Sequence, residues 1–313
     1  MRFGILGPFE VADDQGRVLA LGGFKQRSVL AILLLRAGQV VSTDELIDEV
    51  WGERPPTTAA KTVQVYVSSL RKVLGDGVLI TRARGYVLEV GDGEVDADRF
   101  RVLAAEGARA LRAGELRSGA DRLREALGLW RGAPLAEFTY ERFAQSAISR
   151  LEEGRLAALE ERIDVDLALG EHRGLIGELE VLVREHPLQE RLRGQLMLAL
   201  YRAGRQADAL AVYRELSGLL RDELGLEPSK ALQDLERSIL QHDASLGPPA
   251  GERSGRPLAR AASGRGRVSE PGAGGLVERE GELAAIGALV DAALAGSGRL
   301  LVVAGAAGVG KTR

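Results

Sequence analysis

Basic and short polar side chains cluster between Lys61 and Tyr86, and they suit the binding of phosphate. This stretch holds five basic residues and one acidic residue, a net charge of +4, whereas residues 1–92 hold eleven of each. Lys and Arg displace counterions from nucleic-acid phosphates, so a locally positive surface is what duplex recognition requires. The alternative is a solvated helix followed by an ordinary surface hairpin, because charged runs often do no more than face water.

A helix is predicted over the first half of this stretch. Thr57 or Thr58 can cap its start and Gly75 can end it. Apolar residues recur three and four positions apart and predict the buried face: Ala60, Val63, Val67, Leu70 and Leu74. The same period places Lys61, Val65, Ser68, Ser69 and Lys72 on the opposite face, with Thr62, Gln64 and Arg71 on its flanks. This outer face is suited to lie against a negative surface.

The second half of the stretch predicts a β-hairpin. Val78 to Ile80 leads in, Arg82-Ala83-Arg84-Gly85 forms the turn, and Tyr86 to Leu88 returns. The hairpin would therefore carry two of the five basic side chains at its tip.

Strands and two helices are predicted before the basic helix. Residues 2–21 favour three short strands, the third at Val18 to Leu21. Lys25 to Arg36 favours a helix, and Ser42 or Thr43 can cap another that ends at Gly52. The order is therefore strands, three helices and a hairpin.

This order resembles the winged helix-turn-helix domain of response-regulator effectors. The matching pieces are Val50-Trp51-Gly52, Val67-Ser68-Ser69-Leu70-Arg71-Lys72 within the third helix, and Arg84-Gly85-Tyr86 in the hairpin. In that family the third helix enters the major groove, and the hairpin touches the backbone or the minor groove. The resemblance implies base contacts by Lys61, Gln64, Val65 and Ser68, phosphate contacts by Thr62, Ser69, Arg71 and Lys72, and wing contacts by Arg82 and Arg84. Such a helix can read base edges, and an apolar Val65 can touch a thymine methyl group.

From Asp96 to about residue 243 the sequence predicts helix after helix. Leu169-Gly170-Glu171-His172 aligns with Ala203-Gly204-Arg205-Gln206 at a spacing of 34 residues, and Ala113-Gly114-Glu115 is a looser copy. A helix–turn–helix period of this length is typical of tetratricopeptide repeats. Residues 93–246 hold 28 acidic and 22 basic residues, a net charge of −6, which favours a protein-binding surface over a DNA clamp. A spacer or a dimer scaffold is the alternative.

Four motifs in this segment resemble the bacterial transcriptional activation domain. They are, in order, Ala126 to Gly132, Glu185 to Leu192, Gln195 to Leu210 and Asp222 to Pro228. A winged helix followed by this domain is similar to the layout of the Streptomyces antibiotic regulatory protein family. The resemblance covers about residues 1–245. It implies an activator of antibiotic biosynthesis clusters that binds direct repeats of double-stranded DNA as a side-by-side dimer and recruits RNA polymerase holoenzyme.

The remaining residues predict a linker and the start of a further domain. Residues 247–275 are rich in Gly, Pro, Ser and Arg, which is typical of a disordered tether. A short apolar run then precedes a Walker A match, whose phosphate-binding residues would be Gly305, Gly308, Gly310, Lys311 and Thr312. Residues 276–313 resemble the opening of a signal-transduction ATPase domain. We expect a truncated domain that binds no cofactor here, and ATP with Mg²⁺ in a longer parent.

The whole chain is therefore expected to be mainly α with a small β component, divided into residues 1–92, 93–246, 247–275 and 276–313. It has no cysteine, which fits a reducing cytoplasm, and its three His lack metal-ligand spacing. No apolar run is long enough to span a membrane. Paired catalytic carboxylates and a nucleophile motif are also missing, so we expect no enzyme. The alternatives are the regulatory half of a nucleotide-dependent switch and a plain tetratricopeptide scaffold.

Overall fold

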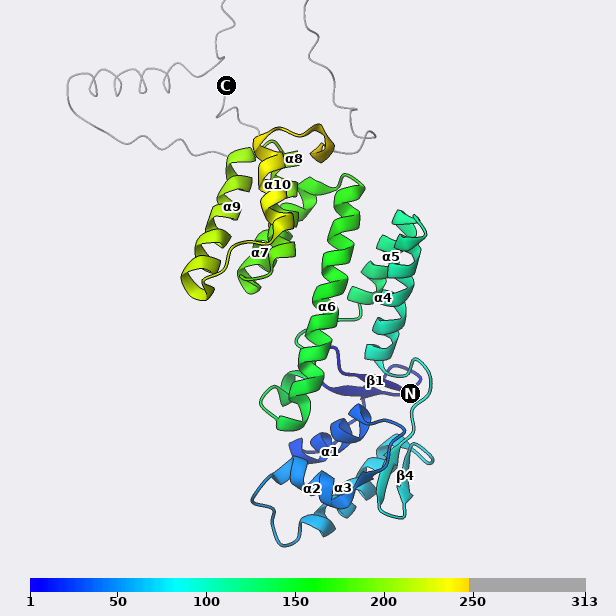
Figure 1. Cartoon of the computed structure of the whole chain (residues 1–313). Coiled ribbons are helices and arrows are strands. Elements are labelled where there is room, and N and C mark those ends of the chain that lie inside the picture. Colours follow the sequence, from blue (N-terminus) through cyan, green and yellow to red (C-terminus); the bar gives the residue numbers. More distant parts are fainter. Residues whose placement is uncertain (248–313) are drawn as a thin grey trace, which may run out of the picture. The chain divides into compact units, whose positions relative to one another are not determined.

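The computed structural model describes residues 1–247, which belong to one compact unit. The fold is mainly helical with a small β component, as the sequence predicts (Figure 1). The predicted linker beyond Gly247, the residues up to 313 and the phosphate loop at Gly305–Thr312 lie outside the described residues. The division at residues 92 and 246 stays a prediction. No helix of the described part is long and apolar enough to cross a membrane.

The N-terminal part contains two small sheets and three helices. Strands β1 (Arg2–Gly4) and β2 (Glu10–Ala12) pair antiparallel with Phe3 opposite Val11. Helices α1 (Phe24–Leu35), α2 (Thr43–Trp51) and α3 (Ala59–Leu74) follow. Strands β3 (Val41–Ser42), β4 (Leu79–Arg82) and β5 (Gly85–Leu88) form the second sheet, with β5 in the middle. This is the predicted order, with β3 as an unpredicted addition.

Two details of the predicted N-terminal part are wrong. No third strand forms at Val18 to Leu21, where Val18 makes only an isolated bridge to Ala12. Leu19 N also donates to Val11 O at 2.8 Å, but Val18 is exposed and no further ladder pair follows among the described residues, so this contact with β2 is too short to make a strand. Ala60 is exposed and its neighbour Ala59 is buried: the rest of the predicted face is buried, and Ala59, four positions before Val63, extends it in the first turn.

The C-terminal part is a succession of helices. Its α-helices are α4 (Asp96–Arg112), α5 (Leu116–Leu127), α6 (Arg142–Ala168), α7 (His172–Glu185), α8 (Glu190–Arg202), α9 (Gln206–Leu219) and α10 (Lys230–Leu240). The shorter turns are η1 (Ala136–Phe138), a π-helical turn at η2 (Leu220–Leu224) and η3 (Ala244–Leu246). The described residues from Asp96 onward contain no strand, as predicted.

The helix-to-helix turns repeat the same backbone geometry. Gly114, Gly170 and Gly204 have φ values of 81°, 92° and 79°, in the left-handed region that glycine tolerates best. In each turn the next residue donates its N–H to the carbonyl five positions earlier, at 2.9–3.0 Å. This is the Schellman arrangement that ends helices. The 34-residue spacing of Gly170 and Gly204 therefore marks equivalent turns.

The buried apolar side chains fall into two separate clusters. The first runs from Phe3 to Ala158 and joins the winged-helix elements to α4, α5 and the part of α6 up to Ala158. The second runs from Ile163 to Ile239 and lies among α6, α7, α8, α9 and α10. One long helix, α6, thus takes part in both cores.

Candidate nucleic-acid interface

Helix α3 is fixed in the fold by one apolar face. Val63, Val67 and Leu70 are fully or almost fully buried, and they pack in the first core with side chains of α1. Thr58 is the N-cap residue and Gly75 the C-cap residue, as predicted, although no side-chain hydrogen bond caps the start. The helix therefore has a defined inner face, which determines the face that it presents outward.

The outer face of α3 carries five of the predicted contact residues. Lys61, Gln64, Val65, Ser68 and Lys72 are all exposed. Val65 keeps 58% of its surface accessible, so its methyl groups can contact an external partner. Among residues 1–247 these four polar side chains have no hydrogen-bond or ion-pair partner. They are thus available to an external partner.

The flanking residues of α3 are already engaged within the fold. Thr62 Oγ1 donates to Thr58 O at 3.0 Å, and Ser69 Oγ accepts from Gln26 Nε2 at 3.2 Å. Gln26 lies on α1 and is itself buried. The pair therefore fixes the crossing of α1 and α3, and the half-buried Thr62 and Ser69 border the exposed strip.

Arg71 links the helix to the hairpin. Its Nε donates to Leu79 O at 2.8 Å, and its Nη2 donates to Thr81 Oγ1 at 2.6 Å. Both acceptors lie on β4, so the guanidinium holds the wing against α3. This pairing favours an orienting role for Arg71 over the phosphate contact that the family resemblance implies.

The wing presents Arg82 and Arg84 at its tip. Arg82 pairs with Gly85 across the hairpin, which leaves a two-residue loop of Ala83 and Arg84, and both arginines are exposed. Gly85 needs its missing side chain, because a Cβ there would lie 2.0 Å from Val41 O on β3. Strand β3 therefore fixes the base of the wing.

Helix α2 is oriented by contacts at both of its ends. Ser42 and Glu45 form a capping box, in which Ser42 Oγ accepts from Glu45 N at 3.1 Å and Glu45 Oε2 accepts from Ser42 N at 2.8 Å. The backbone N–H of Ser42, followed by its hydroxyl group, holds the pKa of Glu45 below its ordinary value. At the other end Lys25 Nζ donates to Val50 O at 3.1 Å and lies 4.8 Å from the centroid of the Trp51 ring.

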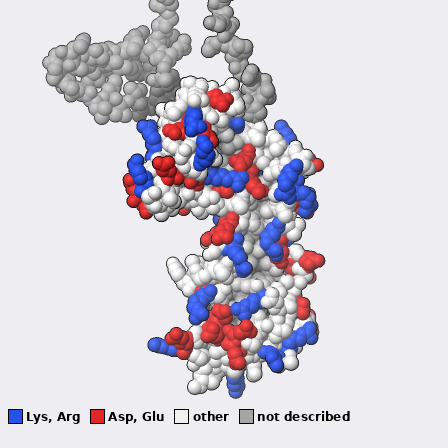
Figure 2. Space-filling model, in the orientation of Figure 1, with Lys and Arg blue, Asp and Glu red and all other residues white. Residues whose placement is uncertain are grey.

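Sequence reasoning missed three supports of this surface: Gln26, strand β3 and the link between Arg71 and β4. Gln26 stands next to a long apolar run, and its polar head is the one signal that could have suggested a buried hydrogen bond. The described part contains no group of His, Asp and Glu that could hold a metal ion. Figure 2 shows basic and acidic side chains interspersed over the face in view. What distinguishes the exposed strip of α3 and the wing is their local positive charge together with the exposure of their side chains.

Two family models match the chain. The model described as "Transcriptional regulatory protein, C terminal" matches residues 20–88. The model described as "Bacterial transcriptional activator domain" matches residues 95–240. The first match contains α1 to β5, including all ten predicted DNA-contact residues, and the second contains most of the helical part.

Curated relatives and one solved structure agree with these models. The chain is 48% identical over 247 residues to "Regulatory protein AfsR" of Streptomyces coelicolor, covering 79% of this chain and 25% of AfsR. It is 40% identical over 274 residues to "Regulatory protein DnrI" of Streptomyces peucetius, covering 84% of this chain and 98% of DnrI.

The solved structure is "Mycobacterium tuberculosis EmbR in complex with low affinity phosphopeptide". It superposes with a TM-score of 0.73 at 36% identity and covers 77% of this chain and 65% of EmbR. The chain thus spans about a quarter of the AfsR proteins and nearly all of DnrI. On these matches, the chain belongs to the Streptomyces antibiotic regulatory protein family of DNA-binding transcriptional activators.

Proposed function

We propose that this activator binds direct repeats in promoter DNA as a side-by-side dimer and recruits RNA polymerase holoenzyme. The regulated genes would be those of antibiotic or other secondary-metabolite clusters. The observation that carries the DNA-binding part is the exposed, unpartnered strip on α3 beside an arginine-tipped wing. Such a protein would act in the cytoplasm and catalyse no reaction of its own.

The exposed side chains divide into base-reading and positioning groups. Lys61, Gln64 and Ser68 can form hydrogen bonds to base edges in a major groove, and Val65 can contact a thymine methyl group. Lys72 can bind a phosphate oxygen, and so can the half-buried Ser69, whose hydroxyl accepts from Gln26 and keeps its own hydrogen. Thr62 could do so only by giving up its hydrogen bond to Thr58 O. Arg82 and Arg84 lie at the wing tip, where they can follow the backbone or enter a minor groove. Arg71 would act through the wing that it holds.

The direct test is a footprint on the DNA upstream of the regulated genes, followed by binding measurements with variants. Lys61→Ala and Gln64→Ala should each weaken the specific site by about 1–3 kcal/mol and affect random DNA far less. Lys72→Ala should weaken both DNAs alike and lower the salt slope by about one, because it removes one phosphate contact.

Arg117→Ala is the matched control. Arg117 is an exposed arginine on α5 with no ion pair within the described residues, so its loss removes one positive charge away from α3. It should leave specific binding unchanged. Equal specific binding by wild type and a Lys61→Ala/Gln64→Ala double variant would contradict the base-reading assignment.

The helical part is the proposed contact for RNA polymerase. Its net charge of −6 disfavours a position along the DNA backbone and favours a surface turned toward protein. A reconstituted transcription assay should show promoter-dependent stimulation by the wild-type chain. Specific DNA binding without any gain in transcript would contradict this part of the proposal.

A nucleotide-dependent switch is the second candidate, and the Walker A match at Gly305–Thr312 favours it. We propose that ATP and Mg²⁺ bind this loop only where a complete P-loop domain surrounds it. In the present chain, Lys311→Ala should change neither DNA affinity nor the heat of titration with Mg·ATP. Micromolar ATP binding that disappears in Lys311→Ala would contradict this assignment.

A further inference from the structure

A loop of the helical part is hydrogen-bonded to the N-terminal strand region. Arg131 N donates to Leu6 O at 2.8 Å, Leu135 N to Ile5 O at 2.9 Å, and Ala136 N to Gly7 O at 3.3 Å. These bonds join the segment between β1 and β2 to the 131–136 loop between α5 and α6. Backbone bonds between segments so distant in sequence fix the position of each relative to the other.

The side chain of Arg131 adds a polar centre to this contact. Its Nη1 lies 2.8 Å from Glu10 Oε1 and 3.3 Å from Pro8 O, and its Nη2 lies 3.1 Å from Asp96 Oδ2. Asp96 opens α4 and also accepts from Ile5 N at 2.8 Å and from the next N–H at 3.1 Å. One guanidinium and one carboxylate therefore join β2, the start of α4 and the 131–136 loop. A planar, five-donor guanidinium is suited to such a junction.

Two glycines make room for Arg131. A Cβ on Gly4 would lie 2.2 Å from Arg131 Nη2, and a Cβ on Gly7 would lie 2.9 Å from Arg131 Cβ. Neither glycine has a positive φ, so the close approach of Arg131, and not backbone conformation, explains the missing side chains.

An aromatic cluster lies in the same region. Phe138 is fully buried, with its ring centroid 5.6 Å from that of Phe9, 5.5 Å from Phe24 and 5.3 Å from Phe143. Phe9 and Phe24 belong to the winged-helix part, and the other two belong to the helical part. Arg27 Nη2 and Glu137 Oε2, 2.5 Å apart, add an ion pair between the same two parts. The winged helix is thus fastened by apolar, ionic and backbone contacts together.

We propose that Arg131 is a positioning residue for DNA binding. It holds α3 and the wing in one orientation relative to α4, α5 and α6. In a dimer of this chain on DNA, that orientation determines the spacing between half-sites that both copies can occupy, because half-site spacing follows from the geometry of the protein pair. The inference about spacing rests on the proposed binding to direct repeats, whereas the inference about orientation does not.

A distance measurement tests the orientation without DNA. The chain has no cysteine, so Glu53→Cys and Arg117→Cys place spin labels on exposed sites of the winged-helix part and α5. Pulsed electron resonance should give one narrow distance distribution for the otherwise native chain and a broad one for Arg131→Ala. Arg101→Ala is the matched control, since it removes an exposed arginine of α4 whose one ion-pair partner among residues 1–247 is Asp98. An unchanged narrow distribution in Arg131→Ala would overturn the proposal.

A binding experiment tests the spacing. Arg131→Ala should bind a single half-site as tightly as wild type, because α3 and the wing are untouched. On two half-sites at the native spacing its cooperativity should fall by about tenfold, within the usual range of coupling between sites. It should also tolerate an insertion of about five base pairs, half a turn of the duplex, better than wild type does.

Two further variants separate positioning from general stability. Glu10→Gln keeps the shape of the ion pair and removes its charge, so it should give a smaller change in the same direction. Arg131→Lys should restore only part of the cooperativity, because a lysine lacks the planar fork. Equal loss of single-site and paired-site binding would overturn the positioning role in favour of a folding defect. If wild type bound no direct repeat while Arg131→Ala still broadened the distances, the proposed function would fail and the orienting role would stand.

Discussion

The winged helix contacts α4, α5 and α6 in one way. The two halves of the helical part contact each other in another way. The first contact combines the ring cluster around Phe138, three backbone hydrogen bonds and the Arg131 centre, within one continuous apolar core. The second lies along α6, between Ala158 at the end of the first core and Ile163 at the start of the second. We call residues 159–166 of α6 and their partners the polar seam.

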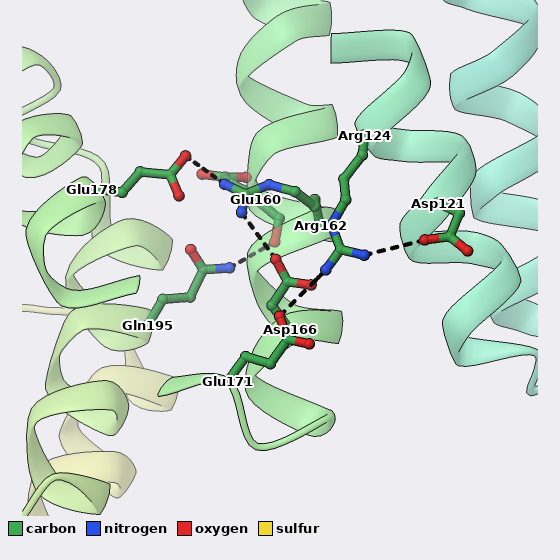
Figure 3. A network of polar contacts seen from close by, with 8 residues as sticks. All are labelled: Asp121, Arg124, Glu160, Arg162, Asp166, Glu171, Glu178 and Gln195. Atoms are coloured by element: carbon green, nitrogen blue, oxygen red, sulfur yellow. Dashed lines mark hydrogen bonds and ion pairs between the residues drawn. The ribbon is translucent and has the colours of Figure 1, made fainter. Parts of the chain in front are cut away.

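Two arginines from different helices share one carboxylate at the polar seam (Figure 3). Asp166 is buried and lies 2.5 Å from Arg124 Nη2 of α5 and 2.9 Å from Arg162 Nη1 of its own helix. Arg162 Nη2 in turn lies 2.5 Å from Glu178 Oε1 of α7. The network therefore joins α5, α6 and α7 through charge.

Amide and carboxylate groups continue the polar seam toward α8. Gln195 Nε2 donates to Glu160 O at 2.8 Å and to Asp164 Oδ1 at 2.6 Å. Gln189 Nε2 donates to Glu160 Oε1 at 2.6 Å, and Arg191 Nη2 lies 2.6 Å from Asp164 Oδ2. Glu160 and Gln195 are buried and hydrogen-bonded here, although Gln195 Oε1 has no partner within the described residues, whereas Asp164 and Arg191 are exposed. Such polar groups specify a geometry while contributing little net stability.

The comparison shows that the gap between the apolar cores does not follow the matched family regions. One core crosses the connection at residues 88–95 between them, whereas the gap falls in the middle of an uninterrupted helix. Apolar burial is nondirectional and stabilises whatever it joins, while ion pairs demand one arrangement. We therefore expect the winged helix, α4 and α5 to gain and lose stability together, and α7 and α8 to respond separately.

Phe138→Ala should give the largest effect, because it empties the centre of the first core. Loss of a fully buried aromatic ring costs about 3–5 kcal/mol. Denaturant unfolding measures the total, and hydrogen exchange should show reduced protection in both α1 and α5. Tyr140→Ala is the control, since Tyr140 is 97% exposed and its loss should change stability by no more than about 0.5 kcal/mol. Full retention of protection in α1 would contradict the expectation that the winged helix and α5 lose stability together.

Asp166→Ala should have the next largest effect, and it should act on α7 and α8 more than on the winged helix. It leaves the mostly buried Arg162 with one of its two partners, and removing one member of a buried ion pair costs about 3 kcal/mol. Amide protection should fall more in α7 and α8 than in α1. Asp121→Ala removes one of the two exposed partners of Arg124 and should be nearly neutral. The same loss of protection in α1 as in α8 would show that the two apolar cores do not respond separately across the polar seam.

Ser42→Ala should have the smallest effect, and it tests whether the winged helix and α5 lose stability together. Loss of this cap costs about 1 kcal/mol, and hydrogen exchange should show it in α2 and α5 but not in α8. Thr43→Ala, one residue along, is the control.

This loss should also depend on pH. The folded-state pKa of Glu45 lies below its ordinary value of 4.5, mainly because its carboxylate accepts from Ser42 N. Its stabilisation is therefore present above pH 4.5 and disappears as pH falls through the lower folded value. Ser42→Ala keeps the backbone N–H and loses only the hydroxyl group, so its difference from wild type should shrink slightly in that acidic range, whereas the difference between wild type and Glu45→Ala should shrink more. A Glu45→Ala difference that grew there would contradict the assigned capping box.

Local patterns in the sequence predicted most of the elements. The helical period, a cap at Thr57 or Thr58 and Gly75 predicted α3, and a turn at Arg82 to Gly85 predicted the wing. Glycine turns at a spacing of 34 residues predicted equivalent helix ends. These features depend on residues a few positions apart, so a single sequence contains the information needed to find them.

Only the tertiary structure decided which partners these residues have. The family resemblance implied the same role for Arg71 and Lys72, yet one is hydrogen-bonded to β4 and the other is free in the described part. The sequence motif around Arg131 indicated a family, and the fold placed its guanidinium against Gly4 and Asp96. A side chain's type and local spacing determine what it can bind. Long-range packing determines which of those partners lies within reach, and no periodicity along the chain encodes that distance.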